Sequence, residues 1–162
     1  MRTLSIAIMG MLIVGSGYGQ WTQLGSDIDE NNYSLSLSSD GNIVAIGDIF
    51  SPAGYTGRVR IFQWNGTEWI QRGSDIDAEA TADRNGWSVS LSADGNIVAI
   101  GAIGNGANGY LSGHVRIFQW DGAAWAQVGD DIDGEAESDR SGNAVSLSSD
   151  GTIVAIGAHY ND

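Results

Sequence analysis

Polar and apolar residues alternate with a period of two in short stretches of this chain, and no helical stripe is present. Residues 88–92, SVSLS, alternate serine with valine or leucine, which is typical of a strand with one apolar and one small polar face. The pair Asp94-Gly95 then favours a tight hairpin turn. Residues 96–102, NIVAIGA, are almost continuously apolar and predict a strand that is covered on both faces.

Two further strands complete this unit. Residues 114–120, HVRIFQW, alternate and are followed by Asp121-Gly122, which is again a hairpin pair. Residues 124–132, AWAQVGDDI, predict a fourth strand after that turn. We therefore expect a sheet of four short antiparallel strands with two apolar faces.

The unit is repeated along the chain. The stretch SLSADGNIVAIGA at 90–102 occurs almost unchanged at 36–48 and at 146–158. Trp69 and Trp125 are 56 residues apart, and Trp21 and Trp69 are 48 apart, because the first unit is shorter. A period near 50 residues is typical of propellers, solenoids and repeat arrays.

A four-stranded sheet with two apolar faces needs a covering layer on each face. Identical sheets packed around an axis provide it, so we predict an all-β fold, an incomplete β-propeller, over residues 20–162. A two-sheet sandwich and a β-solenoid are the alternatives, but a sandwich does not predict a regular four-strand period. The expected parts are a strand at 21–28, blades at 32–77 and 86–133, and a half blade at 142–162. They make about two and a half blades, and we expect the sequence to be a fragment of a longer propeller.

The N-terminus has the layout of a secretory signal peptide. Arg2 precedes an apolar run from Leu4 to Val14, and small residues follow it. We predict a signal peptide at 1–19, with cleavage between Gly19 and Gln20. The alternative, a membrane anchor, needs about 20 apolar residues, and this run is shorter. The mature chain is therefore expected to be secreted or held at the cell surface, with no membrane span.

The amino-acid composition limits the classes of molecule that the chain is expected to bind. The formal net charge is −13, from 20 carboxylates and seven basic residues, all of them arginine. Such a balance repels nucleic acid and anionic membranes and suits an attraction for cations. Cysteine is absent, so no disulfide stabilises the fold.

The repeated unit resembles the FG-GAP repeats of integrin α-subunit propellers, and more closely a variant in exported bacterial and algal proteins. The residues that carry the resemblance are the GNIVAIGA, GHVRIFQW and WAQVGDDID stretches. Asn85 and Ser141 stand where the family has phenylalanine before glycine. The family's calcium loop is reduced here to Asp94-Gly95-Asn96, so the family's metal residues do not carry over. The resemblance implies a propeller with a role in adhesion.

Acidic loops at 74–86 and 130–142 are the candidate metal sites. Each joins one predicted blade to the next, so both are expected at one rim of the stack. Carboxylate oxygens at alternating positions suit calcium, which takes six to eight oxygens. Solvated acidic loops are the alternative interpretation, because no complete calcium-loop pattern is present. The candidate calcium ligands are Asp75, Asp77, Glu79, Asp83, Asp131, Asp133, Glu135 and Asp139.

No group of residues in the sequence indicates a catalytic site. His114 aligns with Arg58 of the preceding unit, which indicates a solvated strand face. The chain has neither cysteine nor lysine, and no nucleophile elbow singles out a serine. Trp120 and Trp125 flank a hairpin and are interpreted as a cross-strand pair, with sugar stacking as the alternative.

These observations favour an exported, non-enzymatic β-propeller module that binds an extracellular protein or glycan in adhesion. The expected partners also include further blades of the same protein, and no cofactor is expected apart from calcium. A hydrolase or lyase whose active site lies in further blades, and a purely structural spacer, are the alternatives.

Overall fold

The regular structure of the described chain consists of strands. The computed structural model describes residues 5–12, 20–29, 31–50 and 55–161. Within these residues no helix is long and apolar enough to cross a membrane. The strand pairs are antiparallel, so the predicted all-β, antiparallel fold is confirmed.

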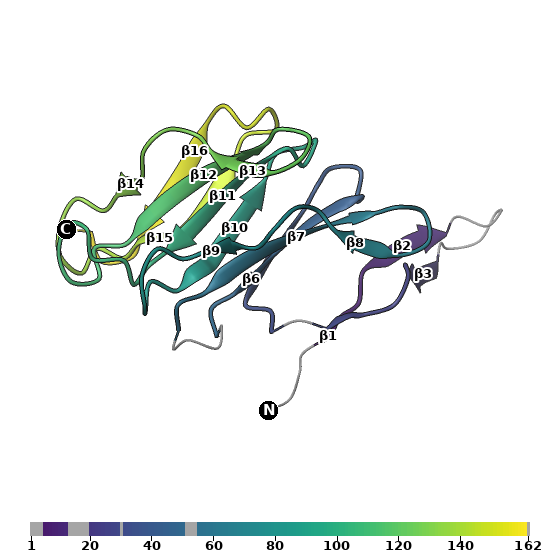
Figure 1. The fold of residues 1–162 in the computed structure, drawn as a ribbon, viewed down its shortest axis with the longest axis horizontal. Coiled ribbons are helices and arrows are strands. Elements are labelled where there is room, and N and C mark those ends of the chain that lie inside the picture. The colour runs from purple at the N-terminus through teal and green to yellow at the C-terminus, as the bar shows by residue number, and fades with distance from the viewer. Residues whose placement is uncertain (1–4, 13–19, 30, 51–54, 162) are drawn as a thin grey trace.

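Each repeat forms its own sheet (Figure 1). The first sheet contains β5 (Ser34–Leu37), β6 (Ile43–Asp48), β7 (Arg58–Trp64) and β8 (Trp69–Gln71), with β9 (Ile76–Asp77) also paired to β7. The second contains β10 (Asn85–Leu91), β11 (Ile97–Ala102), β12 (His114–Trp120) and β13 (Trp125–Gln127), with β14 (Ile132–Asp133) also paired to β12. The third sheet, within the described residues, contains β15 (Ser141–Leu147) and β16 (Val154–Ala158).

The fourth strand of each unit is broken in two, which corrects the continuous strand expected from the sequence. β8 and β9 are separate segments that pair with different parts of β7. Between them Gly73 has a φ of +82°, a conformation that favours glycine. A Cβ on Gly73 would lie 2.7 Å from the ring of Trp120 in the next unit. The chain therefore bends where it passes close to a tryptophan of its neighbour.

Residues near the N-terminus form two small strand pairs. β2 (Met9–Leu12) pairs with β3 (Gln20–Gln23), and β1 (Ser5–Ile6) pairs with β4 (Ile28–Asp29). The strand expected at 21–28 is therefore split into β3 and β4, just as the fourth strand of the first unit is split into β8 and β9. Part of the predicted signal peptide is thus paired in the full chain. The proposed cleavage after Gly19 falls outside the described residues, and the signal peptide stays a prediction.

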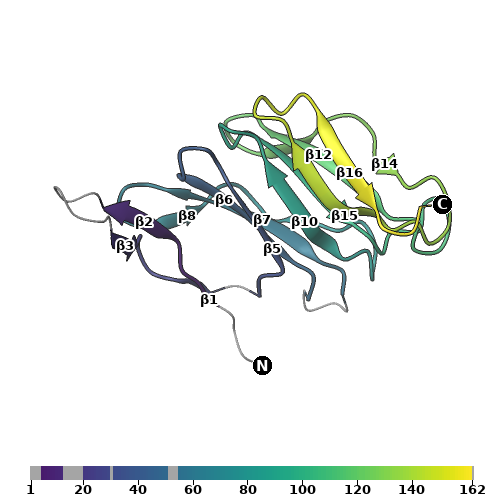
Figure 2. The same cartoon turned by 180° about the vertical axis from the view of Figure 1, so that it is seen from behind.

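Consecutive sheets pack face to face (Figures 1 and 2). Ile43 and Ile61 of the first sheet share an apolar cluster with Val89 and Ile100 of the second. On the opposite face of the first sheet, Val44 lies in a separate cluster with apolar residues of the N-terminal segments. Every position of β6 is buried. The prediction that this apolar strand is covered on both faces is therefore confirmed.

One aligned isoleucine shows that burial depends on the following sheet. Ile43 lies against Gly95 of the second sheet and is only 7% exposed. Ile97 lies against Gly151 of the third sheet and is half-buried. No described sheet follows the third, and Ile153 is 69% exposed. The same residue in the same local sequence is buried only where a neighbouring sheet covers it.

Serines join the first strands of successive sheets. Ser34 Oγ donates to the carbonyl oxygen of Gly86 at 2.7 Å, and Ser88 Oγ donates to that of Gly142 at 2.7 Å. The next serine along β5 and along β10 accepts a backbone N–H from the following sheet. The small polar face predicted for these strands therefore serves as a hydrogen-bonded contact between units.

The backbones approach so closely at this contact that side chains are excluded. A Cβ on Gly101 would overlap the carbonyl oxygen of Gly142 and lie 2.5 Å from Ser88 Oγ. At the aligned Gly157 the nearest atom is Ala144 Cβ at 3.5 Å, an ordinary contact. The tight contacts at Gly101 therefore come from the backbone of the neighbouring sheet and from Ser88 on the adjacent strand, whose aligned residue beside Gly157 is Ala144.

Candidate functional site

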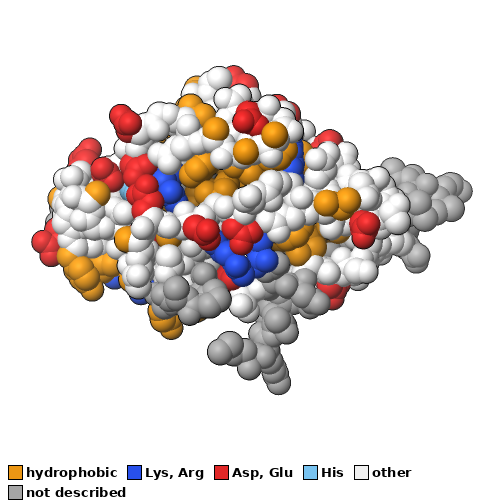
Figure 3. Space-filling view, viewed as in Figure 1, with side chains coloured by type: hydrophobic (Ala, Val, Ile, Leu, Met, Phe, Trp, Pro, Cys, Tyr) orange, Lys and Arg blue, Asp and Glu red, His pale blue; other side chains and the backbone are white. Residues whose placement is uncertain are grey.

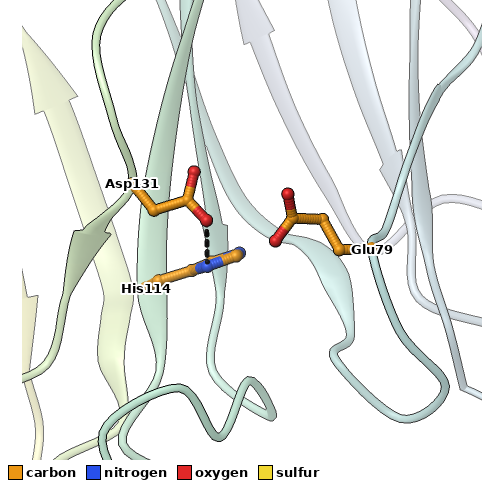
Figure 4. A group of neighbouring side chains, drawn as sticks. All are labelled: Glu79, His114 and Asp131. Atoms are coloured by element: carbon orange, nitrogen blue, oxygen red, sulfur yellow. Dashed lines mark ion pairs between the residues drawn. The ribbon is translucent and has the colours of Figure 1, made fainter.

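The loops that connect successive sheets meet at one end of the strands, as their sequence position predicted. Residues 74–86 contribute Glu79, and residues 130–142 contribute Asp131. Carboxylate oxygens of these two residues and a ring nitrogen of His114 all lie within 4.8 Å of one another (Figure 4). This cluster, Glu79–His114–Asp131, combines one ligand from each acidic loop with a histidine at the start of β12.

Three of the eight predicted calcium ligands serve other contacts. Asp83 and Asp139 are buried, and each accepts a backbone N–H three residues earlier in its own loop at 2.8 Å. Asp75 accepts from Gln71 Nε2 at 2.7 Å and from Arg58 Nη1 at 3.2 Å. These carboxylates stabilise turns and ion pairs within one unit.

The remaining predicted ligands differ in their surroundings. The side chains of Asp77 and Glu135 are exposed. Asp133 is partly exposed, but its Oδ1 is buried without a hydrogen-bond partner and lies 4.0 Å from His114 Nδ1. The structure thus places Asp133, Glu79 and Asp131 beside His114, and Asp83 acts on the same histidine electrostatically.

His114 is buried, which corrects the solvated strand face expected from its alignment with Arg58. Its side chain is 1% exposed, and neither ring nitrogen makes a hydrogen bond. Nδ1 lies 3.3 Å from Asp131 Oδ2, and the ring lies between the two carboxylates (Figure 4). Burial lowers the pKa of His114, the nearby Arg116 lowers it further, and Asp131 and Glu79 act in the opposite direction. Burial thus favours the neutral ring, the form that binds metal ions.

The equivalent position in the preceding unit carries a permanent charge. Arg58 lies 3.2 Å from Asp75 Oδ2 and 3.7 Å from Asp48 Oδ2. In the second unit Asp131 aligns with Asp75 and Ala102 with Asp48, while His114 replaces the arginine. The arginine is thus paired with two acids, whereas His114 supplies no permanent charge to balance its neighbouring acids.

Arg116 lies beside the Glu79–His114–Asp131 cluster, next to Glu79. Its Nη2 donates to the backbone oxygen of Asp77 at 2.7 Å and to Asn85 Oδ1 at 3.1 Å. Its Nη1 lies 3.7 Å from Glu79 Oε1. The guanidinium also lies over the Phe118 ring, 5.3 Å from its centroid. These contacts hold the arginine, which in turn positions Glu79.

The tryptophans form the cross-strand pairs predicted from the sequence. Trp120 lies opposite Trp125 in the strand register, with ring centroids 5.4 Å apart, and Trp64 and Trp69 repeat this geometry. Trp125 Nε1 also donates to the backbone oxygen of Arg72 at 2.8 Å. Each pair therefore stabilises its hairpin and also contacts the preceding unit.

Arg72 is a contact between units that the sequence analysis did not identify. Its guanidinium lies 4.8 Å from the centroid of the Trp120 ring. It also donates to the Gly95 oxygen at 3.0 Å and to Asn96 Oδ1 at 2.6 Å. The aligned positions carry leucine and valine, and this departure from the repeat was the available signal. The change from Arg58 to His114 was the corresponding signal for the histidine.

Two surface hollows lie where successive units adjoin. The first, of about 310 Å³, is lined by Gln63, Trp64, Asn65, Ile70, Gln71, Arg72, Gly73 and Trp120. The second, of about 360 Å³, is lined by Ser74, Asp75, Ile76, Asp77, Arg116, Phe118, Ala124 and Trp125. On the face drawn in Figure 3, hydrophobic side chains gather in a central hollow with charged side chains beside it. Both hollows combine aromatic rings with polar donors and acceptors.

A scan of the chain against protein-family models found no match, and neither did a search of the curated proteins. The FG-GAP resemblance therefore stays a prediction that rests on the quoted residues.

Proposed function

We propose that this chain is part of an exported β-propeller of the FG-GAP type that binds an extracellular glycan or protein and is not an enzyme. The propeller is supported by the way in which successive sheets stack. Their first strands adjoin through the same serine contacts at both junctions. Such an interface can be repeated by further sheets of the same kind.

The observation that carries the binding proposal is the first hollow. It presents the tryptophan rings of two units beside the side-chain amides of Gln63 and Gln71 and the guanidinium of Arg72. Tryptophan faces stack on the apolar faces of sugars, and amides and guanidinium groups bond to hydroxyls. The chemistry of this hollow therefore favours a glycan over a protein as its ligand.

A glycan array followed by affinity measurement tests the proposal. Gln63→Ala removes one amide from the hollow and is expected to lower affinity for a bound glycan about fivefold, the loss of one hydrogen bond. Gln119→Ala is the matched control, because Gln119 holds the equivalent place in β12, opposite Ile97 instead of Ile43, and does not line the hollow.

Three outcomes would contradict parts of this proposal. Equal losses for both variants would remove the hollow as the site. Binding of a protein but no glycan would correct the ligand class, and silence towards both would favour a structural spacer. Cleavage of a bound glycan by the purified chain would refute the non-enzymatic role.

A further inference from the structure

We propose that Glu79, His114 and Asp131 bind a divalent transition-metal ion of the zinc type. This inference concerns a different site from the glycan hollow and does not depend on the propeller or on adhesion. It departs from the calcium site expected within each acidic loop, because its ligands come from two loops and from a histidine on β12 (Figure 4).

The geometry of the ligand atoms supports the site. Carboxylate and imidazole ligands lie about 2.0–2.2 Å from zinc, so neighbouring ligand atoms are about 3.4 Å apart in a tetrahedron. Here the three ligand atoms already lie within 4.8 Å of one another. The half-exposed Glu79 side chain has room to rotate towards the other two ligands, and its exposure also gives the ion a path of entry.

An unpartnered buried histidine is the second, independent observation. The His114 side chain is 1% exposed, and its two ring nitrogens make no hydrogen bond in the structure. A buried polar atom without a partner costs free energy, so native proteins rarely retain one. A metal ion bound to one of the two nitrogens would give that nitrogen a partner.

Comparison of the two units explains what the ion would replace. In the first unit the positive charge of Arg58 lies between Asp48 and Asp75. In the second unit the ring of His114 stands at that place, beside Asp131 and Asp133. The ion would restore the positive charge that the arginine supplies in the preceding unit.

Charge and ligand type both favour a transition metal over calcium. Glu79, Asp131 and Asp133 carry three negative charges, and Arg116 carries one positive charge beside them. The carboxylates outnumber the one guanidinium, so the charge of the site favours a cation. Calcium takes oxygen ligands, whereas an imidazole nitrogen with carboxylates suits zinc and related metals. The unpartnered Oδ1 of Asp133 is available as a fourth ligand.

The ion would fasten two successive units to each other. Glu79 belongs to the loop that leaves the first sheet, whereas His114 and Asp131 belong to the second unit. Binding to the folded chain alone raises its stability as the metal concentration increases. Zinc is therefore expected to raise the melting temperature as well as to bind.

Calorimetric titration of the full chain, prepared without a histidine tag, tests the site. We expect one zinc ion per chain, with no competition by calcium at about 1 mM, the range of extracellular calcium sites. Glu79→Gln removes a ligand from an exposed position and is expected to weaken zinc binding at least tenfold, since even residues that only support ligands cost about 10–100-fold.

Two further variants sharpen the test. His114→Arg recreates the residue of the preceding unit, so we expect it to fold, with the arginine paired to Asp131, and to lose zinc binding. Glu135→Gln makes the same charge change as Glu79→Gln at an exposed position outside the cluster and should leave zinc affinity unchanged. Urea unfolding monitors the fold of each variant, and zinc-edge X-ray absorption should detect one imidazole among oxygen ligands.

Four results would overturn the proposal. The first is the absence of stoichiometric zinc binding, and the second is equal zinc affinity in Glu79→Gln and the parent chain. The third is a zinc-edge absorption spectrum without an imidazole ligand. The fourth is displacement of zinc by calcium together with a loss of zinc affinity in Glu135→Gln. The last would favour calcium within a single acidic loop. If His114→Arg did not fold, the Glu79→Gln comparison would still decide the matter.

Discussion

Truncation of the same isoleucine in two repeats tests whether neighbouring sheets supply the stability of each strand. Ile43→Ala deletes three carbon atoms from a side chain that is 7% exposed. At about 0.8 kcal/mol for each buried carbon, the lost transfer free energy is about 2.4 kcal/mol. The cavity under Gly95 adds to this loss, so the free energy of unfolding should fall by about 3–4 kcal/mol.

Ile153→Ala is the matched control, since its side chain is 69% exposed and buries only about a third as much. The same arithmetic gives a loss of about 0.7 kcal/mol. Urea unfolding followed by tryptophan fluorescence measures both variants. Equal destabilisation would refute the reasoning, because it would mean that burial by the next sheet does not determine the contribution of this isoleucine.

Three further predictions follow from contacts between the units. Gly101→Ala should destabilise the chain by about 2–4 kcal/mol, because the added Cβ overlaps the backbone of the next sheet. Gly157→Ala should change stability by less than about 1 kcal/mol, and equal melting temperatures for the two variants would contradict this prediction. Arg72→Ala should cost about 2–3 kcal/mol in urea unfolding through two charged hydrogen bonds and a cation–π contact, and a loss below about 0.5 kcal/mol would contradict the contact between units. Hydrogen bonds from the Ser148 hydroxyl and from Thr152 lower the pKa of Asp150 to about 2, so the stability that this carboxylate contributes is present above pH 4 and is lost as pH falls towards 2. NMR titration should show a higher pKa for Asp150 in Ser148→Ala, and an unchanged pKa would contradict the stated cause.

Local patterns were sufficient to predict the first three strands of each full unit and the hairpin turns between them. The hairpin at Asp94-Gly95 forms as expected, because Asp94 accepts from Ser92 Oγ at 2.6 Å and from the Asn96 N–H at 3.0 Å. These hydrogen bonds also lower the pKa of Asp94. Both the donors and the acceptor lie within five residues, so the sequence contains all the information that this turn requires.

Contacts between units could not be predicted in the same way. The close approach of the Trp120 ring to Gly73 joins positions 47 residues apart in the chain, and the aligned Gly129 has no such neighbour among the described residues. The burial of His114 depends on contacts with the preceding unit, whose Glu79 lies beside it, and its aligned partner Arg58 is partly exposed. An alignment of the copies does show where residues change, as at positions 58 and 114. It does not show what surrounds them.

The likeness of the two acidic loops suggested two equivalent calcium sites. The structure instead combines Glu79 of one loop with Asp131 of the other. Repetition predicts equal roles for aligned residues, but a cluster at a junction takes different positions from each copy. Asp83 and Asp139, which do keep equal roles, are the residues that close their own turns.

Nuclear Overhauser contacts from methyl-labelled isoleucine test the stacking of the sheets most directly. The account predicts a cross-peak between the δ1 methyl group of Ile43 and the α protons of Gly95, and another between Ile97 and Gly151. It predicts no such inter-sheet contact for the exposed Ile153. Contacts of Ile43 and Ile97 with their own sheet alone would contradict face-to-face stacking.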